Sequence, residues 1–311
     1  MNTKKRHIIP KLSFIAMFLL CVPNLFGQQE PQYTQYNYNT MTVNPGYTGS
    51  RGHFAAISLF RSQWVGLEGS PKTISLGLDS PFEKFDGIGL SIVQDQIGPS
   101  SETFIDVNYA HNIILNRKGH KLALGVKAGG RFLSVDWSKG TFRDPDVLFN
   151  ENINSEFLPT VGAGLFYYTG NAYLGVSTPN ILYNKRYDVL EESVGKDRMH
   201  LYFIGGYVFN INPLLKFKPS TFVKYVEGAP LIADLSLNFL LYERLNLGVN
   251  YRWDDSVGAL FGFQISPQFN IGYAYDYNTN ELNAYNSGTH EIFIRYQLIS
   301  KLTKIKSPRF F

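Results

Sequence analysis

The sequence predicts an all-β fold: a transmembrane antiparallel β-barrel of about fourteen strands, preceded by a cleaved signal peptide. Three observations predict it. Segments of about ten residues alternate apolar with polar side chains, which is typical of a membrane barrel. Aromatic residues make up 15% of the chain, and charged residues only 17%. Beyond the N-terminus, no stretch approaches the roughly 20 apolar residues that a membrane helix needs.

The clearest alternation lies in residues 269–278. Ile271, Tyr273, Tyr275 and Tyr277 alternate there with Gly272, Ala274, Asp276 and Asn278. Side chains in a strand point to opposite faces at every second residue, so one face is aromatic and the other small or polar. The same pattern recurs in residues 247–254, 233–239 and 105–109, and less cleanly in 291–296.

Applied along the chain, this pattern predicts a strand at each of the following segments: 53–62, 72–79, 87–95, 102–114, 120–133, 160–169, 172–178, 200–210, 215–226, 231–241, 244–253, 257–266, 269–278 and 289–298. The two longest connections, 134–159 and 179–199, follow odd-numbered strands. The short turns at 169–171, 241–243 and 267–268 follow even-numbered strands. Long external loops and short periplasmic turns are the usual asymmetry of outer-membrane barrels. The sequence therefore favours the cell outer membrane of a Gram-negative bacterium.

Charged residues fall on the polar face of these strands. A charge that faces lipid at the bilayer midplane costs about 2–4 kcal/mol, so we expect this face to line the lumen. The predicted luminal polar residues are Asp106, Lys127, Arg131, Lys224, Asp234, Arg252, Glu291 and Arg295. They form either a solvated, salt-bridged lumen or a selectivity ring or docking surface. Glycines, 28 in number, let tilted strands curve and make room in the lumen.

A soluble antiparallel barrel would also show alternating strands. Its apolar face would be an aliphatic core, whereas here Tyr and Trp gather toward strand ends, as in the aromatic belt at a membrane interface. Examples are Trp64, Tyr251, Trp253, Tyr277 and Tyr296. This placement favours the membrane barrel.

The chain divides into four parts. Residues 1–27 read as a signal peptide, with Lys4, Lys5 and Arg6 before a short apolar core, which is too short for a membrane anchor. Cys21 is the only cysteine and is expected to leave with it, so the mature chain has no disulfide. Residues 28–50 have no strand register and form either a periplasmic arm or a luminal segment. Residues 51–300 form the barrel, and residues 301–311 a periplasmic tail.

Two further expectations concern single segments. Pro219 lies inside a predicted strand and lacks the N–H that a ladder needs, so we expect the strand to be broken or bulged there. The tail carries Lys301, Lys304, Lys306 and Arg309. It is either a solvated end or a contact to a periplasmic partner or to anionic lipid.

No constellation of catalytic or metal-binding residues stands out. No two of the six histidines lie three to five residues apart, and no Gly-x-Ser-x-Gly segment occurs. Residues 66–73 (GLEGSPKT) are only faintly similar to a phosphate-binding loop, because Pro71 replaces the second glycine. The sequence predicts no cofactor, no metal and no enzymatic activity. The net charge of +4 is too modest to indicate nucleic-acid binding.

Many short segments together resemble the PorP/SprF family of Bacteroidetes outer-membrane proteins. The N-terminal half contributes 44–50 (NPGYTGS), 61–66 (RSQWVG), 69–73 (GSPKT), 87–91 (GIGLS) and 97–99 (IGP). The C-terminal half contributes 215–220 (LKFKPS), 224–226 (KYV), 228–230 (GAP), 251–253 (YRW), 258–260 (GAL), 262–264 (GFQ), 271–277 (IGYAYDY), 287–292 (SGTHEI) and 307–311 (SPRFF). Their number and order make the resemblance specific.

The resemblance implies a non-enzymatic component of the type IX secretion system. The family is associated with export and cell-surface display of large adhesins, with gliding motility in some members, and with the periplasmic ring of the machine. The implied partners are outer-membrane lipid, a secreted adhesin client and periplasmic secretion components. We expect residues 134–199 to carry client specificity, as exposed loops on a rigid scaffold often do. The candidate partner-binding residues of the tail are Ser307, Pro308, Arg309, Phe310 and Phe311.

Two rival hypotheses remain open. A barrel of this size could hold a narrow lumen and act as a passive channel for small or hydrophobic solutes. An outer-membrane enzyme such as a lipase would need a nucleophile beside a base, and the sequence offers no such arrangement. The sequence leaves the client, the open or plugged state of the lumen and the stoichiometry with the periplasmic ring undetermined.

Overall fold

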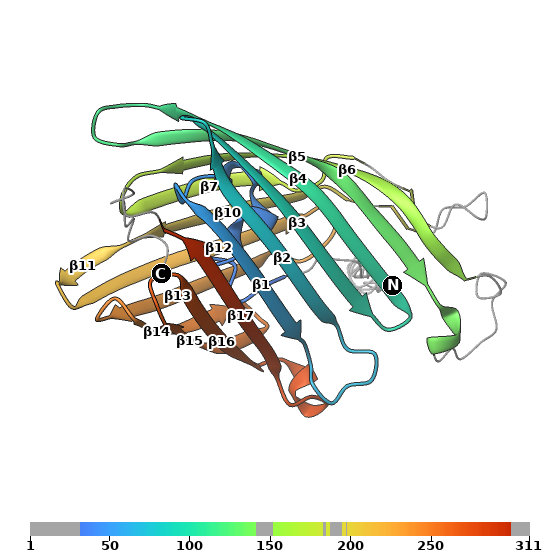
Figure 1. The fold of residues 1–311 in the computed structure, drawn as a ribbon. Helices are drawn as coiled ribbons and strands as arrows, with labels where there is room; N and C mark the ends of the chain where they lie inside the picture. The colour runs from blue at the N-terminus through green and yellow to red at the C-terminus, as the bar shows by residue number, and fades with distance from the viewer. Residues whose placement is uncertain (1–31, 141–151, 183–184, 187–194, 197, 300–311) are drawn as a thin grey trace, which may run out of the picture. The chain divides into compact units, whose positions relative to one another are not determined.

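The computed structural model describes residues 32–140, 152–182, 185–186, 195–196 and 198–299 of the 311-residue chain. In this part of the chain, one antiparallel sheet of 15 strands closes on itself (Figure 1). Successive passes of the chain through the barrel wall pair with each other, and β1 pairs with β17 to close the barrel. Strands β10 and β11 are two parts of one pass, separated by Val208, so the chain makes fourteen passes (15 strands less one interruption). The predicted fold class is confirmed.

The strands have the following bounds: β1 Phe54–Ser62, β2 Lys72–Phe82, β3 Asp86–Ile97, β4 Ser100–Ile114, β5 Lys121–Val135, β6 Ile153–Tyr168, β7 Ala172–Thr178, β10 His200–Tyr207, β11 Phe209–Asn212, β12 Leu215–Val226, β13 Ile232–Leu241, β14 Leu245–Arg252, β15 Ser256–Gln264, β16 Phe269–Asn278 and β17 Thr289–Leu298. The two-residue strands β8 (Lys185–Arg186) and β9 (Gly195–Lys196) pair only with each other. Short helical turns lie at α2 (Thr40–Val43), η1 (Pro45–Tyr47), η2 (Trp137–Lys139) and η4 (Glu281–Ala284).

The two ends of the barrel differ in their connections. We call "loop end" the end with connections 63–71, 98–99, 136–152, 179–199, 227–231, 253–255 and 279–288. We call "turn end" the end with connections 83–85, 115–120, 169–171, 213–214, 242–244 and 265–268. β1 begins and β17 finishes at the turn end. The two longest connections are both at the loop end.

The alternation of side chains holds around the barrel. In β14 and the turn after it, Leu247, Val249, Tyr251 and Trp253 are exposed on the outside, whereas Asn250 and Arg252 are buried inside. An outward face of Leu, Val, Ile, Phe and Tyr suits a hydrocarbon solvent, since strands in a membrane must present apolar groups to lipid. In the described part of the chain, no helix has the length and hydrophobicity that crossing a bilayer would require.

Pro219 does not have the effect on its strand that the sequence predicts. Pro219 does not break or bulge β12, which keeps an unshifted register with β13 from Leu215 to Lys224. The interruption lies instead in the facing pass, at Val208 between β10 and β11, next to the place where Pro219 offers no N–H. The break predicted within residues 215–226 is therefore wrong in its position.

β6 also begins earlier than the sequence predicts, at Ile153 instead of residue 160. Pro159 lies inside it and pairs with Gly130 of β5 without a register shift. The backbone of Val161 bonds away from β5, to Asn180 and Ile181. Since bonding direction alternates along a strand, Pro159 also turns its missing N–H away from β5. The ladder with β5 therefore loses nothing, and the connection after β5 is shorter than predicted.

Candidate functional site: the barrel interior and its plug

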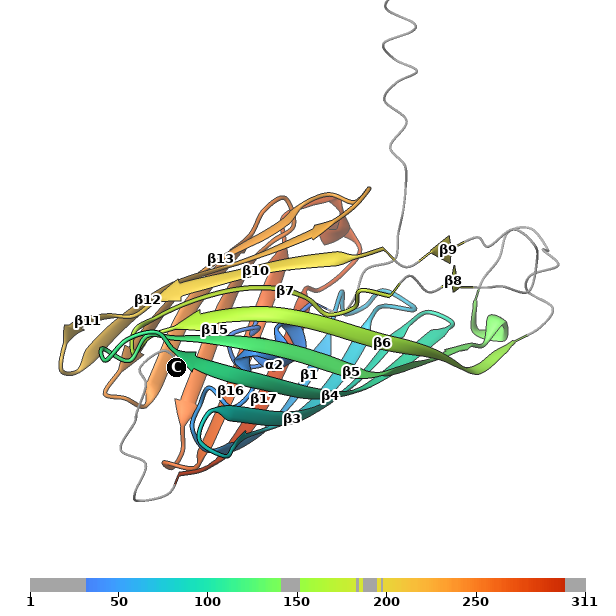
Figure 2. The same cartoon turned by 90° about the horizontal axis from the view of Figure 1, so that it is seen from above.

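Residues 32–50 lie inside the barrel, and we call this segment the plug. Tyr36 is 2% exposed, Asn44 0% and Thr48 0%. The views in Figures 1 and 2 both place its helical turn α2, in blue, between the barrel walls. Met41, Val43 and Tyr47 of the plug pack into one apolar cluster with wall residues of β5, β6, β7, β10 and β12. Of the two positions that the sequence leaves open for residues 28–50, residues 32–50 occupy the luminal one in the structure.

The centre of the plug is a tight turn at Asn44-Pro45-Gly46. The Asn44 Oδ1 accepts a hydrogen bond from the Gly46 N–H at 2.8 Å, and Pro45 starts η1, where a missing N–H has no cost. The Asn44 Nδ2 donates to the Leu165 carbonyl of β6 at 3.0 Å. Gly49 then takes a positive φ of 73°, which favours glycine, and its N–H donates to Asp79 Oδ1. This chemistry fixes the plug's path and ties it to the wall.

Glycines of the wall make room for the plug. A Cβ on Gly125 of β5 would lie 2.1 Å from the Gly46 nitrogen. A Cβ on Gly87 of β3 would lie 2.3 Å from the Thr48 carbonyl oxygen, and one on Gly164 of β6 2.2 Å from Asn44 Oδ1. These approaches are shorter than any real contact of a Cβ. The wall from β3 to β6 therefore fits the plug only because side chains are missing there.

Hydrogen bonds to a buried ion-pair network anchor the plug on the wall formed by β1, β16 and β17. Glu291 of β17 accepts hydrogen bonds from the backbone N–H groups of Thr34 at 3.0 Å and Gln35 at 2.7 Å. Arg61 of β1 pairs with Glu291 at 2.9 Å and with Asp276 of β16 at 3.2 Å. The Thr34 hydroxyl accepts from Arg61 and donates to Asp276. Both acids and Arg61 are at most 4% exposed. Charges buried this deeply are tolerated because each has a close partner.

Tyrosines of the plug complete the contact. Tyr38 stacks on Phe293 of β17, with ring centroids 4.1 Å apart, and its hydroxyl accepts from Asn246 Nδ2 of β14 at 2.7 Å. The Arg295 guanidinium lies 5.2 Å from the Tyr38 ring centroid. Tyr36 packs on Phe222 of β12. Burial is the main reason that the pKa values of Tyr36 and Tyr38 are raised above their ordinary value.

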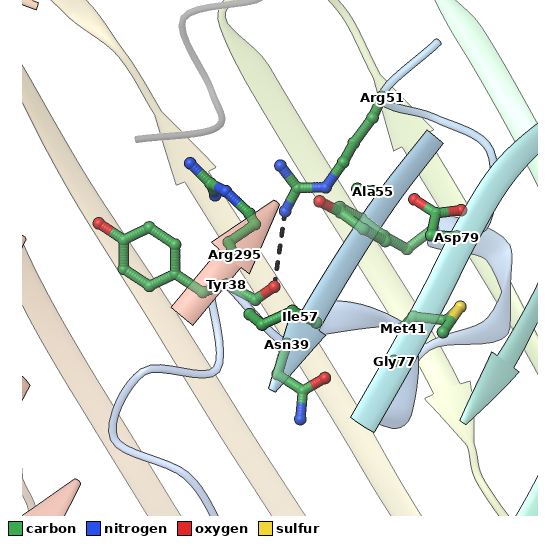
Figure 3. Close-up of a pocket in the computed structure, with 10 residues that line it drawn as sticks. Tyr38, Asn39, Met41, Arg51, Ala55, Ile57, Gly77, Asp79 and Arg295 are labelled. Carbon is green, nitrogen blue, oxygen red and sulfur yellow. Dashed lines mark hydrogen bonds between the residues drawn. The ribbon is translucent and has the colours of Figure 1, made fainter. Parts of the chain in front are cut away.

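A small cavity remains between the plug and the wall (Figure 3). Its volume is about 20 Å³, which is room for about one water molecule. Arg51, Asp79 and Arg295 line it, and Arg51 donates to the Tyr38 carbonyl at 3.5 Å. A cavity of this size suits a bridging water rather than a substrate. Among the described residues, no group of three or more His, Cys, Asp or Glu side chains has an arrangement that could hold a metal ion.

Comparison with known protein families gives one match over most of the chain. The model of the PorP/SprF family, described as type IX secretion system membrane proteins, matches residues 25–296. The chain belongs to the PorP/SprF family. The resemblance identified from the sequence segments is thereby confirmed. Comparison with curated proteins gives no match.

Comparison of this PorP/SprF protein with solved structures gives several similar chains. The outer membrane protein Omp33 of Acinetobacter baumannii is 10% identical with a TM-score of 0.47, and the match covers 79% of this chain and 99% of Omp33. The toluene transporter TbuX of Ralstonia pickettii is 11% identical with a TM-score of 0.48, covering 84% and 93% of the two chains. A FadL homologue of Pseudomonas aeruginosa is 13% identical with a TM-score of 0.43, covering 87% and 95%.

In this PorP/SprF protein, the eight predicted luminal residues all lie buried on the inner face. Asp106 pairs with Lys127 at 3.0 Å and also accepts from the Thr160 hydroxyl at 2.6 Å. Arg252 pairs with Asp234 at 2.8 Å. The other predicted residues do not join one site. Arg131 lies 3.6 Å from Glu102, Lys224 lies 6.0 Å from the Tyr202 ring, and Glu291 and Arg295 both face the plug.

Sequence reasoning missed Arg61, Asp79 and Lys218, which are all buried inside the barrel. Arg61 could have been found, because it alternates with the outward Phe60 next to a strand end. Asp276 was placed on the correct polar face but not singled out. The candidate partner-binding residues 307–311 lie outside the residues that the structure describes.

Proposed function

We propose that this PorP/SprF protein is a non-enzymatic component of type IX secretion in the outer membrane. It supports the export or the cell-surface attachment of a large secreted adhesin, and in a gliding bacterium it contributes to motility. In this proposal the signal peptide of residues 1–27 directs export, the loop end faces outward, and the turn end with the tail meets periplasmic components. The family match over residues 25–296 is the observation that carries the proposal.

The plug weighs against the passive channel as the main role. A water-filled porin leaves polar wall groups to solvent. Here residues 32–50 satisfy many of those groups directly, through Glu291, Asp276, Asn246 and Ser220. A filled interior suits a protein that works through its two ends rather than through its lumen.

Gene deletion tests the proposal. Deleting the gene should remove a large secreted protein from the cell surface and from the medium, as measured by proteolytic shaving of intact cells and mass spectrometry. Complementation with the full-length gene should restore it. The amounts of other outer-membrane proteins serve as the control for general envelope damage. Unchanged surface display of every large exported protein would contradict the proposal.

A second strain tests whether the loop end is the part of the protein that contacts the client. Replacing residues 141–151 with a Gly-Ser linker of equal length leaves the strands of the barrel intact. If the loop end meets the client, this strain should insert a normal amount of barrel and still fail in display. Normal display would show that residues 141–151 are not needed for contact with the client.

A further inference from the structure

The plug crosses the barrel lengthwise, and its direction can be followed residue by residue. At its start, Gln32 Nε2 donates to Asp234 Oδ2 at 3.4 Å. Asp234 is the third residue of β13, and it faces Arg252, the last residue of β14 before the connection 253–255. That connection belongs to the loop end. The first described residue of the chain therefore lies near the loop end.

The next contacts agree with this position. Thr34 and Gln35 bond to Glu291, the third residue of β17, just after the loop-end connection 279–288. Arg61, the penultimate residue of β1, reaches the same carboxylate from the neighbouring strand. Two adjacent strands thus place residues 34–35 in the half of the barrel close to the loop end.

The later plug residues lie at the opposite end. The Thr48 carbonyl approaches Gly87, the second residue of β3, and Gly46 approaches Gly125, early in β5. Both strands begin at the turn end. His53, just before β1, lies 2.8 Å from Gln297, the penultimate residue of β17. From residue 32 to residue 53, the chain therefore runs from the loop end to the turn end. This distance is roughly 30 Å, the length of a strand of about nine residues.

We infer that the amino-terminal end of the plug opens to the outside of the cell. The inference rests on the proposed orientation, in which the loop end faces outward. An arm that enters the barrel from the periplasm would start its luminal path at the turn end, and its first contacts would be with residues such as Gly87 and Gln297. The contacts of Gln32, Thr34 and Gln35 are at the other end. Gln32, which is half-buried, therefore lies at the outer mouth of the barrel, near connection 253–255.

Single-cysteine labelling of intact cells tests this inference. The mature chain is expected to lack cysteine, because Cys21 is the only one in the sequence, so the unsubstituted protein provides the blank. Gln32→Cys is the test variant, since its side chain is half-buried and makes one long hydrogen bond. Asp254→Cys in connection 253–255 reports the loop end, and Lys118→Cys in connection 115–120 reports the turn end. A small membrane-impermeant maleimide is added before or after lysis.

The expected result is that Gln32→Cys and Asp254→Cys react in intact cells to the same extent as after lysis. Lys118→Cys should react only after lysis. Labelling of Gln32→Cys only after lysis, or only after denaturation, would overturn the inference while Asp254→Cys still supported the orientation. Labelling of Lys118→Cys but not Asp254→Cys in intact cells would overturn the orientation itself. Neither result depends on whether an adhesin is displayed, so the proposed function is judged separately.

Discussion

The two walls that hold the plug do so by different physical means. The wall from β3 to β6 meets it with glycines, and backbone approaches backbone at Gly87 and Gly125. The wall formed by β14, β16, β17 and β1 meets it with long polar side chains, among them Asn246, Glu291 and Arg61. The glycine wall offers shape, and the polar wall offers directed hydrogen bonds and charge.

The difference has energetic consequences. A side chain added to the glycine wall collides with backbone, which cannot rotate away, so the plug or the strand must move. A side chain removed from the polar wall leaves a buried donor or charge without its partner, and the rest of the contact survives. We therefore expect changes in the glycine wall to displace the plug and changes in the polar wall to loosen it locally. Four predictions test this difference, from the largest expected effect to the smallest.

The largest effect is expected for Gly125→Ala. The new Cβ would lie 2.1 Å from the Gly46 nitrogen. Overpacking costs about 1–3 kcal/mol and occasionally more, and we expect the upper end here because the obstacle is backbone. The plug should leave its position, so the purified protein should conduct ions in planar bilayers more than the unsubstituted protein does. Chymotrypsin should also cleave at the plug tyrosines.

Gly248→Ala is the matched control for that experiment. Its Cβ would lie 2.4 Å from Asn238 Oδ1, the end of a side chain that can rotate. The barrel should stay folded in both variants, as shown by its faster migration in unheated detergent gels. Equal conductance of the two variants would refute the idea that the glycine wall seats the plug.

The next effect is expected for Glu291→Ala. It removes the acceptor of the Thr34 and Gln35 N–H groups and one partner of Arg61. Breaking a buried ion pair typically costs about 3–5 kcal/mol. Arg61 keeps Asp276 as a partner at 3.2 Å in this variant, so we expect a smaller cost than that. We expect a lower midpoint of unfolding in urea and faster proteolysis at Tyr33, without the conductance of the glycine variant. Glu291→Gln keeps one acceptor oxygen, so its midpoint of unfolding should lie between those of Glu291→Ala and the unsubstituted protein. A midpoint equal to that of the unsubstituted protein would show that these bonds do not hold the plug.

The sequence predicts the wall far better than the plug. The outward face of each strand must be apolar because it meets lipid, so a two-residue rhythm marks strands such as β14 and β16. The same rhythm identifies Asp234 and Arg252 as luminal. The plug touches walls on several sides at once, so its contact residues Tyr36, Asn39 and Asn44 follow no period.

The role of the wall glycines in contacting the plug could not be predicted from the sequence either. In the sequence, Gly87 and Gly125 fit equally well as positions where a tilted strand curves. Only the three-dimensional path of residues 46–48 shows that the plug backbone packs directly against both glycines. Pro219 illustrates a related limit, since its missing N–H affects a facing strand that the sequence does not identify.

A smaller effect is expected for Asn246→Ala. It removes the hydrogen bond from Asn246 Nδ2 to the Tyr38 hydroxyl, which is worth about 1 kcal/mol. The stacking of Tyr38 on Phe293 remains. Asn250→Ala is the control, because Asn250 bonds to Ser236 of the wall at 2.6 Å. Hydrogen exchange of plug amides should be faster in Asn246→Ala than in Asn250→Ala. Identical exchange in both variants would mean that Tyr38 is held by its ring alone.

The smallest effect concerns alkaline pH. Burial raises the pKa values of Tyr33, Tyr36 and Tyr38. A pKa that is higher in the folded state than in the unfolded state means that the protonated tyrosine stabilises the fold. This contribution to stability is fully present below the unfolded pKa of about 10 and is lost as pH rises through the folded-state pKa values. At about pH 11, exposed tyrosines should therefore ionise while Tyr33 and Tyr36 stay protonated. A variant with Tyr33 and Tyr36 replaced by Phe should show the same phenolate absorbance at this pH as the unsubstituted protein. Lower absorbance in the variant would mean that the plug tyrosines reach solvent, and that the polar wall lets the plug open on its own.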